Sequence, residues 1–234
     1  MNKHFTAVFP VKAGRKEKKP QIPTAPEEPK LFLEPQYLGA QITDFDMRDV
    51  VRLPKGLDQN EWVGSNVLEF FNNVNVLYGV SSGESCTNET CPSMSAPGNT
   101  QYLWLDDKGK KLKLTAPQYI NYAMSNIQKY INDESILPTK YDHVFPSDFE
   151  VLVKRVLRLL FQIVAHIYHA HYEQLIFFDL HRHLNSLFIQ VVIFSQEFNI
   201  LDAKDVSVLD DLIEALDLNN ANSKSATNNA SGSS

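Results

Sequence analysis

The hydrophobic positions of the chain follow mostly a helical pattern, with apolar residues returning every three or four positions. The pattern first appears behind Asp58, which has the spacing of an N-terminal capping box with Glu61. The apolar positions that share one helical face there are Val63, Val67, Phe70, Phe71, Val74, Leu77 and Tyr78. This spacing predicts an amphipathic helix with a buried face that is continuous over several turns.

Further helices are predicted downstream. One begins near Thr115, where the following Ala-Pro suits the first helical turn because the N–H that proline lacks would have no partner there. The longest spans about residues 148–174, behind a second candidate capping box formed by Ser147 and Glu150. Two more are predicted over about 183–198 and 205–216. The chain is therefore expected to be mainly α and to fold as a helical bundle.

One segment has the period of a strand instead. Residues 101–114 read QYLWL-DDKG-KKLKL, with alternation on both arms and a glycine in the turn. This pattern predicts a small β-hairpin beside the helices.

Charge divides the chain into three parts. Residues 1–30 carry seven Lys/Arg against three Asp/Glu and are rich in proline, so we expect a disordered basic leader. Residues 219–234 are rich in Asn and Ser and carry one Lys, so we expect a disordered tail. Because the whole chain has a net charge of −6, the domain at residues 31–218 carries −11. An acidic domain argues against a nucleic-acid partner and suits a partner rich in Lys and Arg.

Cysteine content and hydropathy bear on the compartment. Two cysteines are too few for a disulfide framework, and the N-terminus shows no apolar segment typical of a secretory signal. The longest apolar run, Leu187 to Phe194, is broken by Gln190 and falls short of the roughly 20 residues that cross a bilayer. We expect a protein of the cytoplasm or nucleus that does not insert into membranes.

Two groups of metal-binding side chains stand far apart in the sequence. Cys86 and Cys91 follow the first long helix, and His166, His169 and His171 end the longest one. Two thiolates and two imidazoles would complete the tetrahedral shell of a structural zinc ion. On a regular helix His166 and His169 share a face, whereas His166 and His171 point about 140° apart, so helix geometry favours the first pair. Ordinary reduced thiols and a His-rich helix surface remain as alternatives.

Several sequence blocks resemble the Mob family of kinase coactivators, in the same order and over about residues 31–216. They are LPKGLDQNEWVGSNVLEFFNNVNVLYG, CTNETCPSMSA, TAPQYINYAMSNIQ, LPTKYDHVFPSDFE, AHIYHAH and HLNSLFIQVVIFSQEFNILD. The blocks NTQYLWLDDKGKKLKLTAPQY and LEPQYLGAQITDF are most similar to the second subclass, whose usual partners are NDR-type rather than LATS-type kinases. The resemblance implies a helical bundle with one structural zinc ion held by Cys86, Cys91, His166 and His171, which replaces the geometric preference for His169.

The resemblance also implies a kinase-binding surface and a function. The matching positions of this surface are Asp58, Glu61, Trp62 and Glu69. The three carboxylates would pair with a basic helical segment that directly precedes the kinase domain of an NDR-type AGC Ser/Thr kinase. Asp58 and Glu61 can cap the helix at the same time, and core packing is the alternative role of Trp62. The implied protein is a non-catalytic adaptor, monomeric apart from its kinase complex, that favours the active state of the kinase.

One implied feature departs from the family pattern. First-type members bind phosphopeptides through a basic trio whose positions here are Arg158, Leu159 and Gln162, so only one cation is retained. A phosphate needs several converging donors, and we therefore expect phosphopeptide binding at these positions to be lost unless Lys154 and Arg155 substitute for the missing cations. A phosphopeptide-binding scaffold stays as the alternative function, with Arg158 as its candidate residue.

Enzymatic activity is not expected. The sequence contains no Gly-rich phosphate loop, which excludes the common kinase and NTPase sites. The histidine cluster with nearby Glu173 and Asp179 could be taken for a zinc hydrolase, but four protein ligands would leave no position for a catalytic water.

Overall fold

The computed structural model describes residues 29–82, 85–106, 108–138 and 144–219 of the 234-residue chain. The leader predicted over residues 1–30 lies outside the described residues except for its last two positions, and the tail predicted over 219–234 lies outside them except for its first. Both therefore stay predictions.

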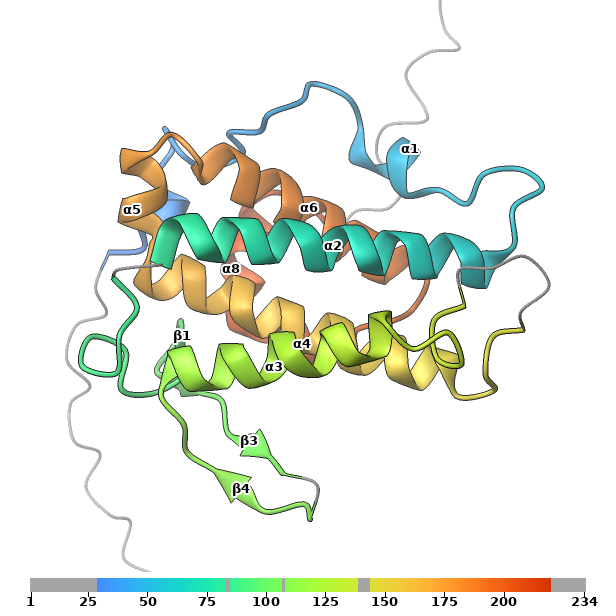
Figure 1. Ribbon diagram of the computed structural model, residues 1–234. Helices are drawn as coiled ribbons and strands as arrows, with labels where there is room; N and C mark the ends of the chain where they lie inside the picture. The colour runs from blue at the N-terminus through green and yellow to red at the C-terminus, as the bar shows by residue number, and fades with distance from the viewer. Residues whose placement is uncertain (1–28, 83–84, 107, 139–143, 220–234) are drawn as a thin grey trace, which may run out of the picture.

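Helices form the body of the molecule (Figure 1). The long ones in the described part of the chain are α2 (Gln59–Ser82), α3 (Ala116–Ile131), α4 (Phe149–Ala170) and α6 (His181–Glu197). The shorter ones are η1 (Leu31–Leu33), α1 (Met47–Val51), α5 (Tyr172–Phe177), α7 (Ala203–Val206), η2 (Ser207–Leu209) and α8 (Asp210–Ala215). α4 packs against α2, α3 and α6, which confirms the predicted helical bundle. None of the described helices has the length and apolar content needed to cross a membrane.

The start of α2 follows its sequence signal, whereas the start of α4 does not. The Asp58 side chain accepts the backbone N–H groups of Asn60 and Glu61 at 2.8 and 3.2 Å, so it caps α2 as predicted. α4 instead has Asp148 at its N-cap position, without a side-chain capping bond. The prediction that Ser147 caps this helix is therefore wrong by one residue.

Aromatic side chains from three helices meet in the core. Phe70 of α2, Phe161 of α4 and both Phe188 and Phe194 of α6 are almost completely buried. The rings of Phe70 and Phe194 meet edge to face with centroids 5.2 Å apart, a favourable aromatic arrangement. The apolar face predicted for α2 is thus the face that packs into the core.

Two short strand pairs lie beside the bundle. β3 (Trp104–Leu105) pairs with β4 (Lys111–Leu112), antiparallel, which confirms the predicted hairpin (Figure 1). β1 (Ser95–Ala96) pairs with β2 (Thr100–Gln101), and this pair was not predicted because two-residue strands show no alternation. β1 packs against α4, so this small sheet closes one side of the bundle.

We expect Phe70→Ala to lower the free energy of unfolding by about 3–5 kcal/mol, because it removes a buried ring and leaves a cavity among three helices. The matched control is Val76→Ala on the same helix, where the side chain is 62% exposed and the change should stay within about 0.5 kcal/mol. Urea unfolding followed by circular dichroism measures both. Equal losses for the two variants would contradict the assigned core.

Candidate metal centre

The loop after α2 is shaped by its own hydrogen bonds. The Cys86 N–H donates to the carbonyl of Ser82, the last residue of α2, at 2.8 Å. The Thr90 hydroxyl donates to the Ser85 carbonyl at 2.6 Å and accepts the Thr87 N–H at 2.8 Å. These local bonds fold the loop tightly, and both of its cysteine side chains are buried.

The helix predicted over 148–174 is interrupted at one residue. α4 ends at Ala170 and α5 begins at Tyr172, while His171 between them has φ −134° and ψ 12°, outside helical values. The preference for His169 assumed a regular helix and is wrong, because this break turns His171 towards His166. His169 itself is exposed.

The four residues named by the resemblance lie together. The Sγ of Cys86 is 3.6 Å from the Nε2 of His166, and the Sγ of Cys91 is 3.7 Å from the Nε2 of His171. All four donor atoms lie within 4.8 Å of one another, and all four residues are buried. The cluster is therefore close enough to hold a metal ion, and two sulfur and two nitrogen donors supply a complete set of ligands from the protein.

The other ring nitrogens of the histidines are also engaged. The Nδ1 of His166 lies 2.8 Å from the Ser95 carbonyl, which can only accept, so this nitrogen carries the proton. The Nδ1 of His171 lies 3.3 Å from the Ser85 hydroxyl. Such bonds fix the ring orientation and leave Nε2 free to bind a metal, as in known metal sites.

Burial sets the protonation of the centre. It lowers the pKa of His166, and it lowers the pKa of His171 to about 4 with a further contribution from His166. The imidazoles are therefore neutral at physiological pH, as metal binding requires. Burial also raises the pKa of the Cys86 thiol to about 12, so a bound metal must displace that proton. The pKa of Tyr78 is raised by burial and by its hydrogen bond to Cys86, which keeps this hydroxyl protonated.

The residues predicted to bind a kinase lie in the first half of α2 and directly before it. Asp58, Glu61 and Glu69 are exposed, and Glu61 and Glu69 lie two turns apart on one side of the helix. Trp62 is half-buried against the core, and its indole N–H donates to the Val51 carbonyl at 3.0 Å. Part of the Trp62 side chain thus packs against the core, as the alternative role of this residue predicted.

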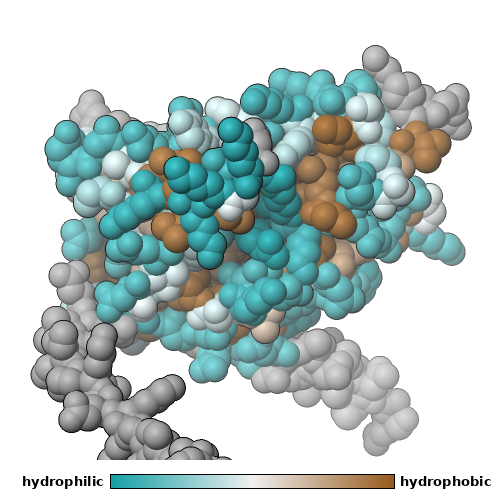
Figure 2. All heavy atoms as spheres, turned by 90° about the horizontal axis from the view of Figure 1, so that it is seen from below, coloured by the Kyte–Doolittle hydropathy of each residue, from teal (hydrophilic) through white to brown (hydrophobic). Residues whose placement is uncertain are grey.

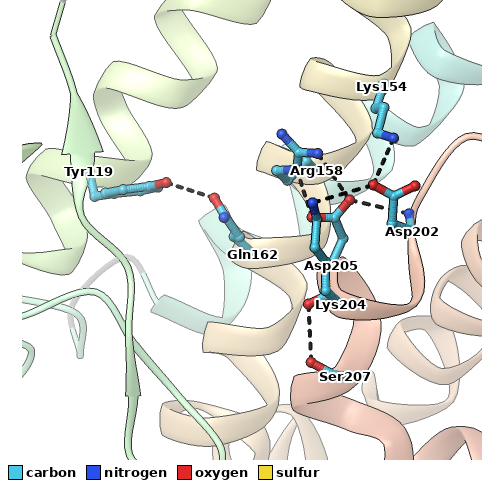
Figure 3. A network of polar contacts seen from close by, with 8 residues as sticks. All are labelled: Tyr119, Lys154, Arg158, Gln162, Asp202, Lys204, Asp205 and Ser207. Atoms are coloured by element: carbon cyan, nitrogen blue, oxygen red, sulfur yellow. Dashed lines mark hydrogen bonds and ion pairs between the residues drawn. The ribbon is translucent and has the colours of Figure 1, made fainter. Parts of the chain in front are cut away.

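The single cation of the depleted basic trio is paired within the chain (Figure 3). The Nε and Nη2 of Arg158 donate to the two carboxylate oxygens of Asp205 at 2.9 and 3.0 Å. The Gln162 side-chain oxygen accepts the Tyr119 hydroxyl at 2.7 Å, and Leu159 packs against the core. From the sequence, Asp205 is predicted only to begin a helix, because a partner 47 positions away leaves no local signal.

These side chains border a pocket of about 500 Å³. Its wall includes Lys30, Arg158, Lys204, Asp205 and Asp211. Lys30 pairs with Asp211 at 2.6 Å, Arg158 pairs with Asp205 at 2.9 Å, and Lys204 lies 3.8 Å from Asp202, so these three cations already have carboxylate partners.

We expect His171→Ala to lose the bound metal, whereas His169→Ala keeps it, because only His171 belongs to the buried cluster. Elemental analysis of the purified proteins measures metal per chain, and thermal unfolding should show a lower melting temperature for His171→Ala. A chelator should lower the melting temperature of the wild type towards that of this variant. Full metal content in His171→Ala would contradict the assigned ligand set.

Comparison with known proteins agrees with this architecture. The Mob1/phocein family model matches residues 39–209, which include the whole metal centre. The chain is 48% identical over 205 residues to "MOB kinase activator 2" of Homo sapiens, covering 88% of this chain and 84% of that protein. It is 46% identical over 189 residues to "MOB kinase activator-like 2" of Drosophila melanogaster, covering 81% and 33% respectively. It is 39% identical over 187 residues to "Maintenance of ploidy protein mob2" of Schizosaccharomyces pombe, covering 80% and 76%.

All three relatives carry the number two in their names, in agreement with the predicted likeness to the second subclass. The family match spans well over half of the sequence. The chain therefore belongs to the Mob1/phocein family.

Proposed function

We propose that the protein is a non-catalytic coactivator that binds the basic segment preceding the catalytic domain of an NDR-type AGC kinase. Membership of a family whose relatives are named kinase activators supports the general role. The observation that carries the assigned surface is the exposed acidic side of α2 at Asp58, Glu61 and Glu69.

The chemistry of this side suits a basic helix. Among the described residues, no Lys or Arg forms an ion pair with Asp58, Glu61 or Glu69, although Asp58 accepts backbone hydrogen bonds. Their charges are therefore available to an incoming Arg or Lys, and charge-assisted bonds of this kind give orientation as well as affinity.

The surface is also held rigidly. The hydrogen bond from Trp62 to the Val51 carbonyl joins the first turn of α2 to the last residue of α1. Because the backbone here is already held by this hydrogen bond, the conformational entropy lost on binding comes mainly from the partner segment. Fixing that segment would shift the kinase population towards its active arrangement without any chemical step.

We infer that the metal is zinc and that its role is structural. Tetrahedral zinc with bonds of about 2.3 Å to sulfur and about 2.0–2.1 Å to nitrogen places a sulfur and a nitrogen ligand about 3.5–3.6 Å apart. The two sulfur–nitrogen distances of 3.6 and 3.7 Å match this value. Four protein ligands leave no position for a catalytic water, so the set does not support a zinc hydrolase. Free thiols kept as ligands suit the reducing cytoplasm or nucleus, where we place the protein.

Replacing Glu61 and Glu69 together by Lys should weaken binding of the kinase segment by about 10-fold to 100-fold, because attraction becomes repulsion at two points. Fluorescence anisotropy with a labelled peptide of an NDR-type N-terminal segment measures this. The matched control carries Glu173→Lys and Glu214→Lys, which make the same charge change at exposed positions outside this surface. If both double variants bind equally, the assigned surface is wrong. A LATS-type segment tested in parallel reports on the kinase class.

The phosphopeptide alternative receives less support, because Arg158 is already held by Asp205 through two hydrogen bonds. We expect a phosphothreonine peptide and its unphosphorylated form to bind the wild type equally weakly in isothermal titration calorimetry. Arg158→Ala should not change this result. Binding that needs both the phosphate and Arg158 would restore the scaffold function.

A further inference from the structure

The β3–β4 hairpin has two unlike faces. One face packs on the body, where the Trp104 ring meets the Tyr119 ring edge to face at 5.4 Å. The residues of this inner face are half-buried: Tyr102, Trp104, Leu112 and Leu114. Because side chains alternate along a strand, the residues between them face outwards.

The outer face combines aliphatic and cationic side chains. Leu103 and Leu105 are 44% and 55% exposed, and Lys111 and Lys113 on the other arm are exposed too. The register pairs Leu105 with Lys111, so an aliphatic and a cationic side chain stand directly beside each other on this face. Leu103 and Leu105 are two positions apart on one arm, so both lie on this same face beside the lysines.

The turn of the hairpin adds two more cations. Lys108 and Lys110 are exposed, and their backbone N–H groups donate to the Asp106 carboxylate at 2.9 and 2.8 Å. Asp106 is half-buried and shapes the turn. Within the described part of the chain, no carboxylate forms an ion pair with any of the four hairpin lysines. Residues 101–114 carry a net charge of +2 within a domain of −11.

We propose that this outer face is a peripheral docking element for an anionic membrane surface. The lysines would contact the headgroups, and Leu103 and Leu105 would enter the boundary between headgroups and acyl chains. A lysine contributes to the affinity for anionic lipid only when it lies close to the membrane surface. The electrostatic potential of that surface decays within about 8–10 Å in physiological salt. The proposal concerns a protein that lies on a membrane without spanning it.

The shape of this region favours a lipid surface over an acidic peptide. The hairpin projects from the bundle (Figure 1), whereas peptides are usually taken up in grooves. The pockets of about 500 and 340 Å³ have neither leucine and none of the four lysines in their walls. A lipid surface deforms around a projecting group and needs no groove.

The charge distribution would also orient the protein. Figure 2 views the molecule from the side on which the hairpin projects, and it shows a mainly hydrophilic surface with small separate hydrophobic patches. Since the rest of the domain is acidic, an anionic surface repels it and attracts the hairpin. The hairpin would thus be the part of the domain that approaches such a surface first.

Vesicle co-sedimentation of the full chain tests the proposal, with phosphatidylcholine vesicles alone and with added phosphatidylserine. We expect binding only to the vesicles that contain phosphatidylserine, and we expect added salt to weaken it. Lys111→Gln with Lys113→Gln should lower the partition coefficient roughly 30-fold, from about fivefold per lysine. The matched control, Lys129→Gln with Arg155→Gln, removes two exposed cations elsewhere and should bind like the wild type.

A second variant, Leu103→Ser with Leu105→Ser, keeps all charges and should also bind more weakly. Both leucines are exposed, so the fold is retained, and circular dichroism checks this. Every variant keeps residues 1–30, so the basic leader contributes equally throughout. Wild-type binding by the lysine or the leucine variant would overturn the proposal. The absence of vesicle binding together with hairpin-dependent binding of a poly-glutamate peptide would overturn it in favour of an acidic protein partner.

Discussion

The contact between the Cys86–Cys91 loop and the end of α4 determines how several parts of the molecule are placed. Each sulfur meets a histidine 80 positions further along the chain, so this cluster of two cysteines and two histidines joins two regions that are distant in the sequence. The same loop holds the start of α3, because the Cys91 carbonyl accepts the Ala116 N–H at 3.0 Å. The hairpin in turn packs on α3 through Trp104 and Tyr119. The cluster of cysteines and histidines is therefore linked, through the loop, to one helix and one hairpin.

Local sequence patterns predicted the helices but not their interruptions. The apolar face of α2 is recognisable from its period, because the core selects one side of a long helix. The break at His171 has no such signal, since buried Tyr168, Tyr172 and Leu175, at spacings of four and three residues, continue the helical period across it. The helix predicted over 205–216 is likewise divided into η2, α8 and the end of α7. Breaks of this kind arise from contacts between distant residues.

The candidate sites show the same division between local and distant causes. Asp58 caps α2 as its sequence position indicates, because capping involves neighbours only. The choice of His171 as a member of the cluster followed from the resemblance to a family and not from helix geometry, which favoured His169. The Arg158–Asp205 pair joins α4 to α7 and was not foreseen at all. Residue spacing thus identifies a cap, whereas a site built from two distant segments needs either a relative or a structure.

The Arg158–Asp205 pair has a consequence for any anion that approaches this part of α4. Asp205 is fixed in the fold with a side chain that is only 8% exposed, and it already satisfies the guanidinium through two hydrogen bonds. An incoming anion would have to displace this tethered carboxylate, whose effective concentration is on the order of millimolar or higher. A single internal carboxylate can thus change which ligands a helical framework accepts, without any change in the helices that carry it.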